Sequence, residues 1–374
     1  MTLRKRLLSI DALRGLVILF MLLDHVRETF LLHRQVSDPM SIDSTEPALF
    51  FSRTLAHLCA PVFVLLTGLS AWLYGQKYQG RRDVSAFLFK RGLFLVVLEF
   101  TLVNFAWTFQ LPPSVIYMQV IWAIGISMIA LAALVWLPRA WLIGLALVII
   151  AGHNLLDGLH FAAGHPLHTL WAVLHDRGWI EVSETLRLRT SYPVLPWIGI
   201  ICLGYACGPW FAQGWAAPDR QRRLLAWAAT ALGLFVALRA LNVYGDRPWV
   251  VGASSGETLM SFFNVTKYPP SLLFTALTLG TGLLLLLLLE RRDGRLSAWL
   301  AVLGSAPMFF YILHLYVLQC IARGLEAGGI APRMGGVWQV WALTAVLTLA
   351  LYPAVRAFAR FKARRRDLAW LKYL

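Results

Sequence analysis

Apolar runs of about 20 residues recur along the whole chain, and they constrain its fold more than any other feature. A helix of about 20 residues spans the hydrocarbon core of a bilayer, because each residue adds about 1.5 Å. We therefore predict an all-α, polytopic membrane bundle of about ten transmembrane helices. The predicted spans are 8–30, 54–75, 89–108, 116–137, 140–157, 192–211, 223–243, 270–290, 298–321 and 337–357.

The composition supports a membrane-embedded chain and argues against a nucleic-acid-binding protein. Hydrophobic residues make up 59% of the sequence and charged residues 14%, about half the charge of a soluble domain. A net charge of +15 could indicate a nucleic-acid partner, but the Lys and Arg residues fall mainly between the apolar runs. We expect no nucleic acid, a single membrane-embedded domain over 1–374, and a basic cytoplasmic tail at 358–374 that contacts membrane lipid.

The distribution of basic residues predicts the side of the membrane on which each loop lies. With the N-terminus inside, 22 of the 34 Lys and Arg residues fall in cytoplasmic segments and the tail, as the positive-inside rule requires. Both termini are then cytoplasmic and the long connections lie outside. These connections are 31–53, 158–191, 244–269 and 322–336. We expect a multi-pass protein of the bacterial cytoplasmic (inner) membrane.

The first span carries ionisable residues where charge is costly. Asp11, Arg14 and His25 share one helical face, because eleven residues at about 100° each bring His25 within about 20° of Arg14. Asp24 lies about 80° from that face and could turn toward a neighbouring helix. We predict an ion pair near the cytoplasmic end and an imidazole in the outer half. The alternative is that the pair only fixes the helix end and His25 only satisfies a backbone carbonyl.

Polar residues of the next two spans are further candidates, each with a structural alternative. Arg53 and His57 are one helical turn apart near the outer surface, and long side chains there could instead snorkel to the interface. Glu99 lies within the third span and must be protonated or paired, with Arg14 as one candidate partner. Asn104 lies five residues further along the chain. We expect these residues to contribute to a binding site.

Two later segments complete the set of candidate residues. The prolines in 264–271 fix the approach to the eighth span and hold Lys267 and Tyr268 at its outer mouth. Tyr311 and His314 are three residues apart in the ninth span, where a lone histidine is as often structural as functional. Lipid does not tolerate such groups, so we expect all of these ionisable residues to face one shared cavity.

No metal is expected. His165, His168 and His175 lie close together within 164–178. A metal site is conceivable there, but a short amphipathic helix in the outer interface is the simpler interpretation. The four cysteines all lie in apolar runs and lack the spacing of metal ligands.

Four motifs resemble one family of transmembrane acyltransferases, those related to heparan-alpha-glucosaminide N-acetyltransferase. Residues 8–21 (LSIDALRGLVILFM) resemble the opening of that family, and 56–68 (AHLCAPVFVLLTG) resemble its second helix. Residues 266–274 (TKYPPSLLF) and 310–315 (FYILHL) resemble its bacterial members. The resemblance runs in order from residue 8 to about residue 320.

The resemblance implies transfer of an acetyl group from cytoplasmic acetyl-CoA to an acceptor across the membrane. In the lysosomal member, an Asn at the outer end of the first helix and a His in the following loop are linked to catalysis. His25 occupies the Asn position here, His33 is the nearest candidate for the loop His, and His57 stands where the lysosomal protein has Asp. These departures mean that a heparan-type acceptor is not implied.

We therefore predict an acetyl-CoA-dependent membrane acyltransferase that modifies an amine or hydroxyl of an extracytoplasmic envelope glycan or glycolipid. His25, Asp24 and His57 are the candidate catalytic residues. The candidate substrate-binding residues are Asp11, Arg14, Arg53, Glu99, Asn104, Lys267, Tyr268, Tyr311 and His314. The alternatives are a transporter or flippase of an envelope precursor without chemistry, and a scaffold in an envelope-synthesis complex. The sequence does not indicate an oligomeric state.

Overall fold

The computed structural model describes residues 3–34, 36–77, 80–212, 214–292, 294–365, 367–368 and 371, with side chains from Leu8 onward. The tail predicted at 358–374 therefore falls partly outside the described residues, namely at 366, 369–370 and 372–374. Its first residues continue a helix that runs to Arg364.

Within the described residues, six helical stretches are long and apolar enough to cross a membrane. They are Pro47–Gly75, Arg139–Leu156, Ala217–Leu241, Leu272–Arg291, Pro307–Ala327 and Val337–Arg364. Three further apolar helices are shorter, and α1 (Leu3–Phe30), with Asp11, Arg14 and Asp24 in its sequence, is not among the six. The protein is thus mostly helical with at least six candidate spans, while the total of about ten stays a prediction.

Helix breaks account for the main differences from the predicted spans. The segment predicted at 298–321 is two helices, α13 (Arg295–Gly304) and α14 (Pro307–Ala327). Pro307 begins the second helix, a position where its missing N–H costs nothing. The second predicted span is likewise divided at residues 57–58, between α2 (Pro47–Ala56) and α3 (Cys59–Gly75).

The third predicted span changes its helical type along its length. It begins as α4 (Arg81–Leu98), passes through a π-helical segment, η2 (Glu99–Val103), and ends as α5 (Asn104–Thr108). π-helical segments are rare and are frequently found at functional sites. Glu99, the carboxylate identified from the sequence, opens this segment.

The contacts within the chain divide it into two compact units. Unit 1 comprises residues 1–59, 249–264 and 281–374, and unit 2 comprises residues 60–248 and 265–280. Helix α12 (Leu272–Arg291) contributes residues to both units. The single domain over 1–374 stays a prediction.

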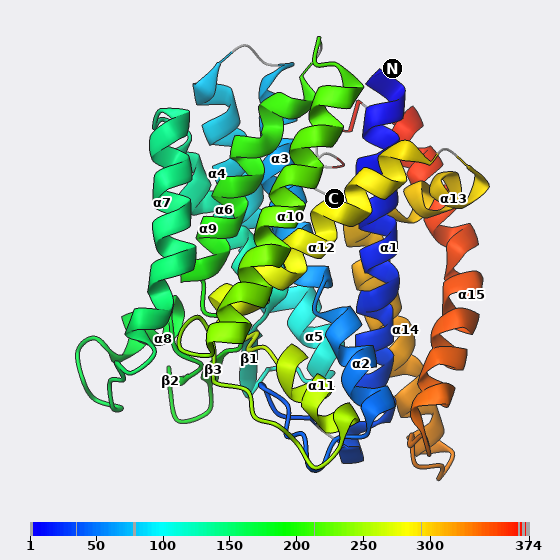
Figure 1. Ribbon diagram of the computed structural model, residues 1–374. Helices are drawn as coiled ribbons and strands as arrows, with labels where there is room; N and C mark the ends of the chain where they lie inside the picture. Colours follow the sequence, from blue (N-terminus) through cyan, green and yellow to red (C-terminus); the bar gives the residue numbers. More distant parts are fainter. Residues whose placement is uncertain are drawn as a thin grey trace. The chain divides into compact units, whose positions relative to one another are not determined.

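Unit 1 is built around α1. This helix packs against α13, α14, α2 and α15 (Val337–Arg364), and Figure 1 shows α13 beside its N-terminal half. Backbone contact at the crossing depends on glycine, because a Cβ at Gly304 would collide with the carbonyl oxygen of Asp11. A Cβ at Gly15 would likewise collide with the carbonyl oxygen of Leu300. A short helix, α11 (Ser255–Phe263), packs against α2.

Unit 2 contains the remaining helices. After α3 to α5 these are α6 (Val120–Leu134), α7 (Arg139–Gly152), η3 (His153–Leu156), α8 (His168–Leu174), α9 (Leu195–Cys207), η4 (Gly208–Phe211) and α10 (Ala217–Leu241). Helix α6 packs against α4 and α9, and α7 packs against α9. Gly68 of α3 and Gly204 of α9 allow their two backbones to touch, since a Cβ on either would overlap the other helix.

A small sheet in unit 2 corrects the all-α prediction. Strand β3 (Arg187–Thr190) lies in the centre, parallel to β1 (Val115–Met118) and antiparallel to β2 (Trp179–Glu181). Strand β1 replaces the start of the span predicted at 116–137, so the helix there, α6, has only 15 residues. Within 164–178, where a short amphipathic helix was predicted, the seven residues of α8 are helical, and the place of this helix in the outer interface stays a prediction.

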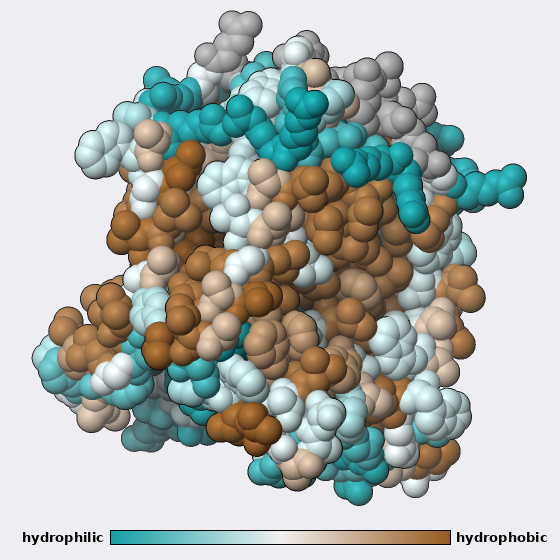
Figure 2. All heavy atoms as spheres, viewed as in Figure 1, coloured by the Kyte–Doolittle hydropathy of each residue, from teal (hydrophilic) through white to brown (hydrophobic). Residues whose placement is uncertain are grey.

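Several helices expose large apolar side chains, as expected for surfaces in contact with lipid. Trp141 and Val148 on α7 are 72% and 69% exposed. In unit 1, Trp338 and Leu349 on α15 are 71% and 69% exposed. Figure 2 shows broad hydrophobic areas on the face that it draws. A soluble protein rarely exposes apolar patches of this extent.

Candidate functional site

Two histidines from distant parts of the sequence form a pair inside unit 1. Nδ1 of His25 on α1 lies 2.7 Å from Nε2 of His314 on α14. The two rings are stacked, with centroids 5.0 Å apart and an interplanar angle of 10°. Tyr311, one turn before His314, places its ring edge-on to both imidazoles. His314 is fully buried and His25 is partly buried.

The hydrogen bonds of this pair define the tautomer of each ring. Nδ1 of His314 lies 2.7 Å from the carbonyl oxygen of Phe310, which can only accept, so this nitrogen donates. In a neutral imidazole, Nε2 of His314 is then the acceptor, and Nδ1 of His25 must donate to it. The proton on Nδ1 leaves the lone pair of His25 on Nε2. A lone pair on a partly exposed imidazole is the feature required of a general base.

Asp24 lies beside His25 in sequence but makes its ion pairs with arginines. Its Oδ1 is 2.8 Å from Nη2 of Arg27 and 3.2 Å from Nη1 of Arg53 on α2. All three residues are buried. The expectation that Asp24 could turn toward a neighbouring helix is confirmed, since Arg53 lies on α2. Arg27, which the sequence analysis did not single out, shares the carboxylate.

The other charged pair of α1 is also present. Nη1 of Arg14 lies 2.8 Å from Oδ1 of Asp11, and the side chains are 20% and 32% exposed. The i, i+3 spacing explains why they meet. His57 occupies the C-cap position of α2 and is 3% exposed, so it does not snorkel to the surface.

In unit 2, Glu99 and Asn104 satisfy backbone groups. Oε2 of Glu99 accepts a hydrogen bond of 2.8 Å from the backbone N–H of Trp122, in the first turn of α6. The carboxylate therefore caps that helix, where the dipole favours negative charge. The side chain of Asn104 bonds the backbone of Val115 and Tyr117 in β1, each at 3.0 Å. Both residues thus have structural partners in unit 2.

Lys267 and Tyr268 belong to a cationic and aromatic cluster of unit 2. Nζ of the buried Lys267 lies 5.0 Å from the ring centroid of Tyr268 and 5.7 Å from that of Tyr192. The hydroxyl groups of the two tyrosines are 3.3 Å apart. The guanidinium of Arg177 lies 4.7 Å from the Tyr268 ring. Flat rings and cations of this kind can bind a sugar face and an acidic group.

Asp246, which was not among the predicted site residues, organises the backbone near Lys267. Its carboxylate accepts hydrogen bonds from the backbone and hydroxyl of Thr266, at 2.8 and 2.7 Å, and from the hydroxyl of Ser271 at 2.5 Å. Asp246 follows Gly245, whose φ of +96° requires a residue without a Cβ. Nothing in the local sequence pattern distinguishes Asp246 from other loop acids.

A second group that the sequence analysis missed lies elsewhere in unit 2. His153, Asp157 and His175 come together, whereas His165 and His168 make separate contacts. Burial acts to raise the pKa of the Asp157 carboxyl, but hydrogen bonds with His175 and Asn154 outweigh it and hold that pKa below its usual value. Burial acts to lower the pKa of His175, but hydrogen bonds with Asp157 and Asp176 outweigh it and raise that pKa.

The long apolar helices are those of a helical membrane protein, and the His25–His314 pair lies inside unit 1. Residues 6–244 match the sequence profile described as heparan-alpha-glucosaminide N-acetyltransferase, catalytic. Because the match covers well over half of the chain, the protein belongs to this family of membrane-embedded proteins, whose description indicates N-acetyltransferase activity. No curated protein matches the chain. The motifs at 266–274 and 310–315 lie beyond the matched residues.

Proposed function

We propose that this protein is a membrane acyltransferase that moves an acetyl group from cytoplasmic acetyl-CoA to an amine or hydroxyl of an extracytoplasmic glycan or glycolipid. The observation that carries the proposal is the His25–His314 pair, whose hydrogen bonds leave the lone pair of His25 on Nε2. An imidazole is the side chain best suited to accept a proton near neutral pH.

The chemical step needs only this base. As the acceptor amine or hydroxyl attacks the thioester carbonyl carbon, its proton passes to Nε2 of His25. The C–S bond breaks, and the CoA thiolate then takes the proton from the imidazolium to leave as the free thiol. The products are an amide or ester and CoA. An acyl-histidine intermediate on His25 would give the same products.

Basic residues support binding of the donor. Arg14 and the basic segments at 81–91, including Arg81, Arg82 and Arg91, would attract the phosphates of CoA if they face the cytoplasm as proposed. The proposed orientation places both termini inside the cell and the long connections outside, in the bacterial cytoplasmic membrane.

Residues that bind the acceptor are proposed from their own chemistry. The cluster of Lys267, Tyr268, Tyr192 and Arg177 offers aromatic faces and cations to an envelope sugar. We retain His57 as a candidate catalytic residue because its imidazole is buried. The contacts described above support structural roles for Asp24, Arg53, Glu99 and Asn104.

The proposal is tested with purified protein, radiolabelled acetyl-CoA and a panel of amino- and hydroxyl-bearing envelope sugars. We expect labelled acceptor and free CoA to appear in equal amounts with the native chain. His25→Ala should abolish both, while His165→Ala, which alters an exposed imidazole with no role in the proposed chemistry, should leave them unchanged. Thermal unfolding of each variant shows that it is folded. A folded His25→Ala variant with the native rate contradicts the proposal, and so does binding of the sugar without acetyl turnover.

A further inference from the structure

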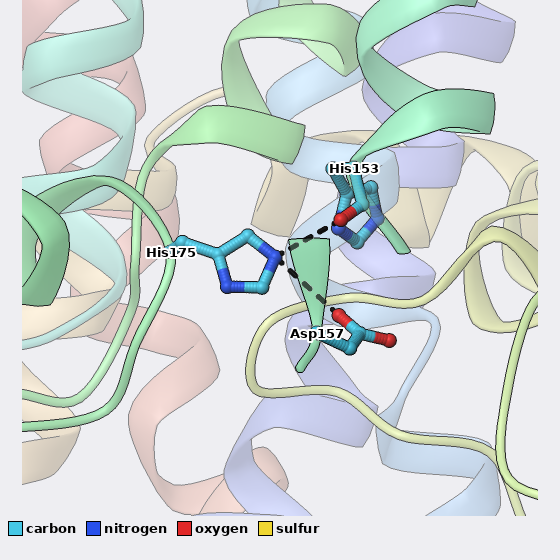
Figure 3. Close-up of side chains that lie close together, drawn as sticks. All are labelled: His153, Asp157 and His175. Atoms are coloured by element: carbon cyan, nitrogen blue, oxygen red, sulfur yellow. Dashed lines mark hydrogen bonds and ion pairs between the residues drawn. The ribbon is translucent and has the colours of Figure 1, made fainter. Parts of the chain in front are cut away.

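Apart from the residues of the proposed acyl transfer, a cluster in unit 2 gathers three side chains of the types that bind transition metals. His153 opens η3 at the end of α7, Asp157 follows that segment, and His175 lies just after α8. Each offers one ligand atom, and these atoms all lie within 4.8 Å of one another. Figure 3 shows the imidazole of His175 pointing toward the other two residues.

The spacing of the ligand atoms fits a metal ion. Nε2 of His175 lies 3.4 Å from Oδ1 of Asp157. Two ligands bound tetrahedrally at about 2.1 Å from an ion are separated by about 3.4 Å. The same nitrogen is 3.1 Å from the backbone carbonyl oxygen of His153. Only a small movement of the third imidazole is needed to close the site around one ion.

His153 supplies an independent sign of a missing partner. It is 2% exposed, yet neither of its ring nitrogens has a hydrogen bond of normal geometry within the described part of the chain. The backbone of Pro270 approaches the ring closely enough for a weak hydrogen bond, but not with normal geometry. A buried polar group without a partner costs about 1–3 kcal/mol. Coordination to a metal through one ring nitrogen would satisfy this side chain.

Neighbouring residues hold two of the ligands in an orientation suited to coordination. Oδ1 of Asp176 lies 3.2 Å from Nδ1 of His175 and can hold a proton on that nitrogen. Nε2 of His175 faces two acceptors, the His153 carbonyl and Oδ1 of Asp157, so a metal ion would take the place of the proton that Nε2 donates to them. The side-chain amide of Asn154 donates to Oδ2 of Asp157 at 2.9 Å, which leaves Oδ1 directed at the cluster. Partners of this kind orient the ligands in known metal sites.

We propose that His153, Asp157 and His175 bind one divalent transition-metal ion, with Zn²⁺ as the preferred ion. Two imidazoles and one carboxylate match the ligand preference of zinc. The side chain of Asp157 is 50% exposed, so water can occupy the fourth position. The ion joins the end of α7 to the segment after α8 and stabilises this part of unit 2. The site is separate from the acyl-transfer chemistry proposed above.

The test uses the full-length protein in detergent, stripped with a chelator, dialysed and then incubated with one equivalent of ZnCl₂. After gel filtration, elemental analysis is expected to find about one zinc per chain for the native protein. Asp157→Asn and His175→Asn should each weaken zinc binding at least about tenfold in a competition titration. His165→Asn is the matched control, because its ring lies in the same segment, is exposed and is not part of the cluster.

Thermal unfolding separates binding from folding. Zinc should raise the unfolding temperature of the native protein and the His165→Asn variant, but not that of Asp157→Asn. If His175→Asn does not fold, the half-exposed Asp157 still provides the test. The proposal is overturned if the stripped native protein takes up no zinc, or if Asp157→Asn binds zinc as tightly as the native chain. In either case the cluster is an ion-free hydrogen-bond network.

Discussion

At the scale of residues, the central feature is a pair of imidazoles, His25 and His314, that form a hydrogen bond with each other. An unpaired ring inside a membrane helix would be expensive, and here His25, His314 and the Phe310 carbonyl form one chain of hydrogen bonds. In the proposed mechanism, His314 is a positioning residue for His25. Its proposed role is to accept the hydrogen bond from Nδ1–H of His25, so that the lone pair of His25 lies on Nε2.

This role can be tested by keeping or removing the acceptor atom at position 314. His314→Leu removes it, and we expect CoA release to fall about 100-fold. His314→Gln keeps an acceptor oxygen and should recover a large part of the rate. The measurement is kcat for CoA release across a pH series, with thermal unfolding as the control for folding. Equal rates for the two variants would contradict the positioning role.

The pairing of Asp24 with two arginines predicts an asymmetry in stability. Asp24→Asn removes the carboxylate that Arg27 and Arg53 share, and we expect the free energy of unfolding to fall by about 3–5 kcal/mol. Arg53→Met leaves the Arg27–Asp24 pair in place and should cost only about 1–2 kcal/mol. Denaturant unfolding in detergent measures both. A larger loss for Arg53→Met would show that Asp24 is not the centre of this cluster.

The sequence could identify residues of the site only where neighbours along one helix carry the information. The face shared by Asp11, Arg14 and His25 follows from helical spacing, and the Asp11–Arg14 pair is confirmed. The roles of Glu99 and Asn104 depend on backbone groups of α6 and β1, which no local pattern reveals. The same is true of His153, whose neighbour His175 is separated from it by an intervening loop and helix.

At the scale of elements, pairs of helices within each unit pack backbone against backbone where one of them has a glycine. A Cβ at Gly204 of α9 would overlap the backbone of Leu65 on α3, and a Cβ at Gly68 would overlap that of Ile201. Such backbone contacts are typical of packing between membrane helices. If α3 and α9 moved apart by a few tenths of an ångström, the backbone contacts at Gly68 and Gly204 would be lost.

A matched pair of glycine substitutions tests this packing. Gly204→Ala should lower the stability by about 1–3 kcal/mol, because backbone on α3 has to move. Gly144→Ala, within α7, meets nothing within 4 Å and should raise stability by up to about 1 kcal/mol through helix propensity. Thermal unfolding by intrinsic fluorescence compares them. Equal and neutral effects would show that the α3–α9 crossing is looser than described.

Element prediction succeeded where apolar runs are long and failed where the chain changes type. Helices α10, α12 and α15 lie close to the spans predicted for them. The π-helical segment η2 and the strands were missed, because the pairing of β1 with β3 joins residues more than 70 positions apart. Short strands of this kind carry too few residues for their periodicity to be recognised.

At the scale of the whole molecule, the positive-inside distribution predicts an orientation that can be measured in cells. In a background without native cysteines, Thr185→Cys lies between β2 and β3, in a connection predicted to be outside. We expect a membrane-impermeant maleimide to label it in intact cells. Arg222→Cys, near the start of α10 on the predicted inner side, should be labelled only after permeabilisation. The reverse pattern would contradict the proposed orientation and, with it, the cytoplasmic donor.

The most direct measurement of the central claim is acetyl transfer across a sealed bilayer. Proteoliposomes are prepared with an amino-sugar acceptor trapped inside, and radiolabelled acetyl-CoA is added outside. The account predicts that labelled acceptor accumulates inside, that CoA is released outside, and that His25→Ala abolishes both without loss of folding. The proposed transfer is contradicted if unlabelled acceptor leaves the vesicles without release of CoA. It is also contradicted if the folded His25→Ala variant labels the acceptor as fast as the native protein does.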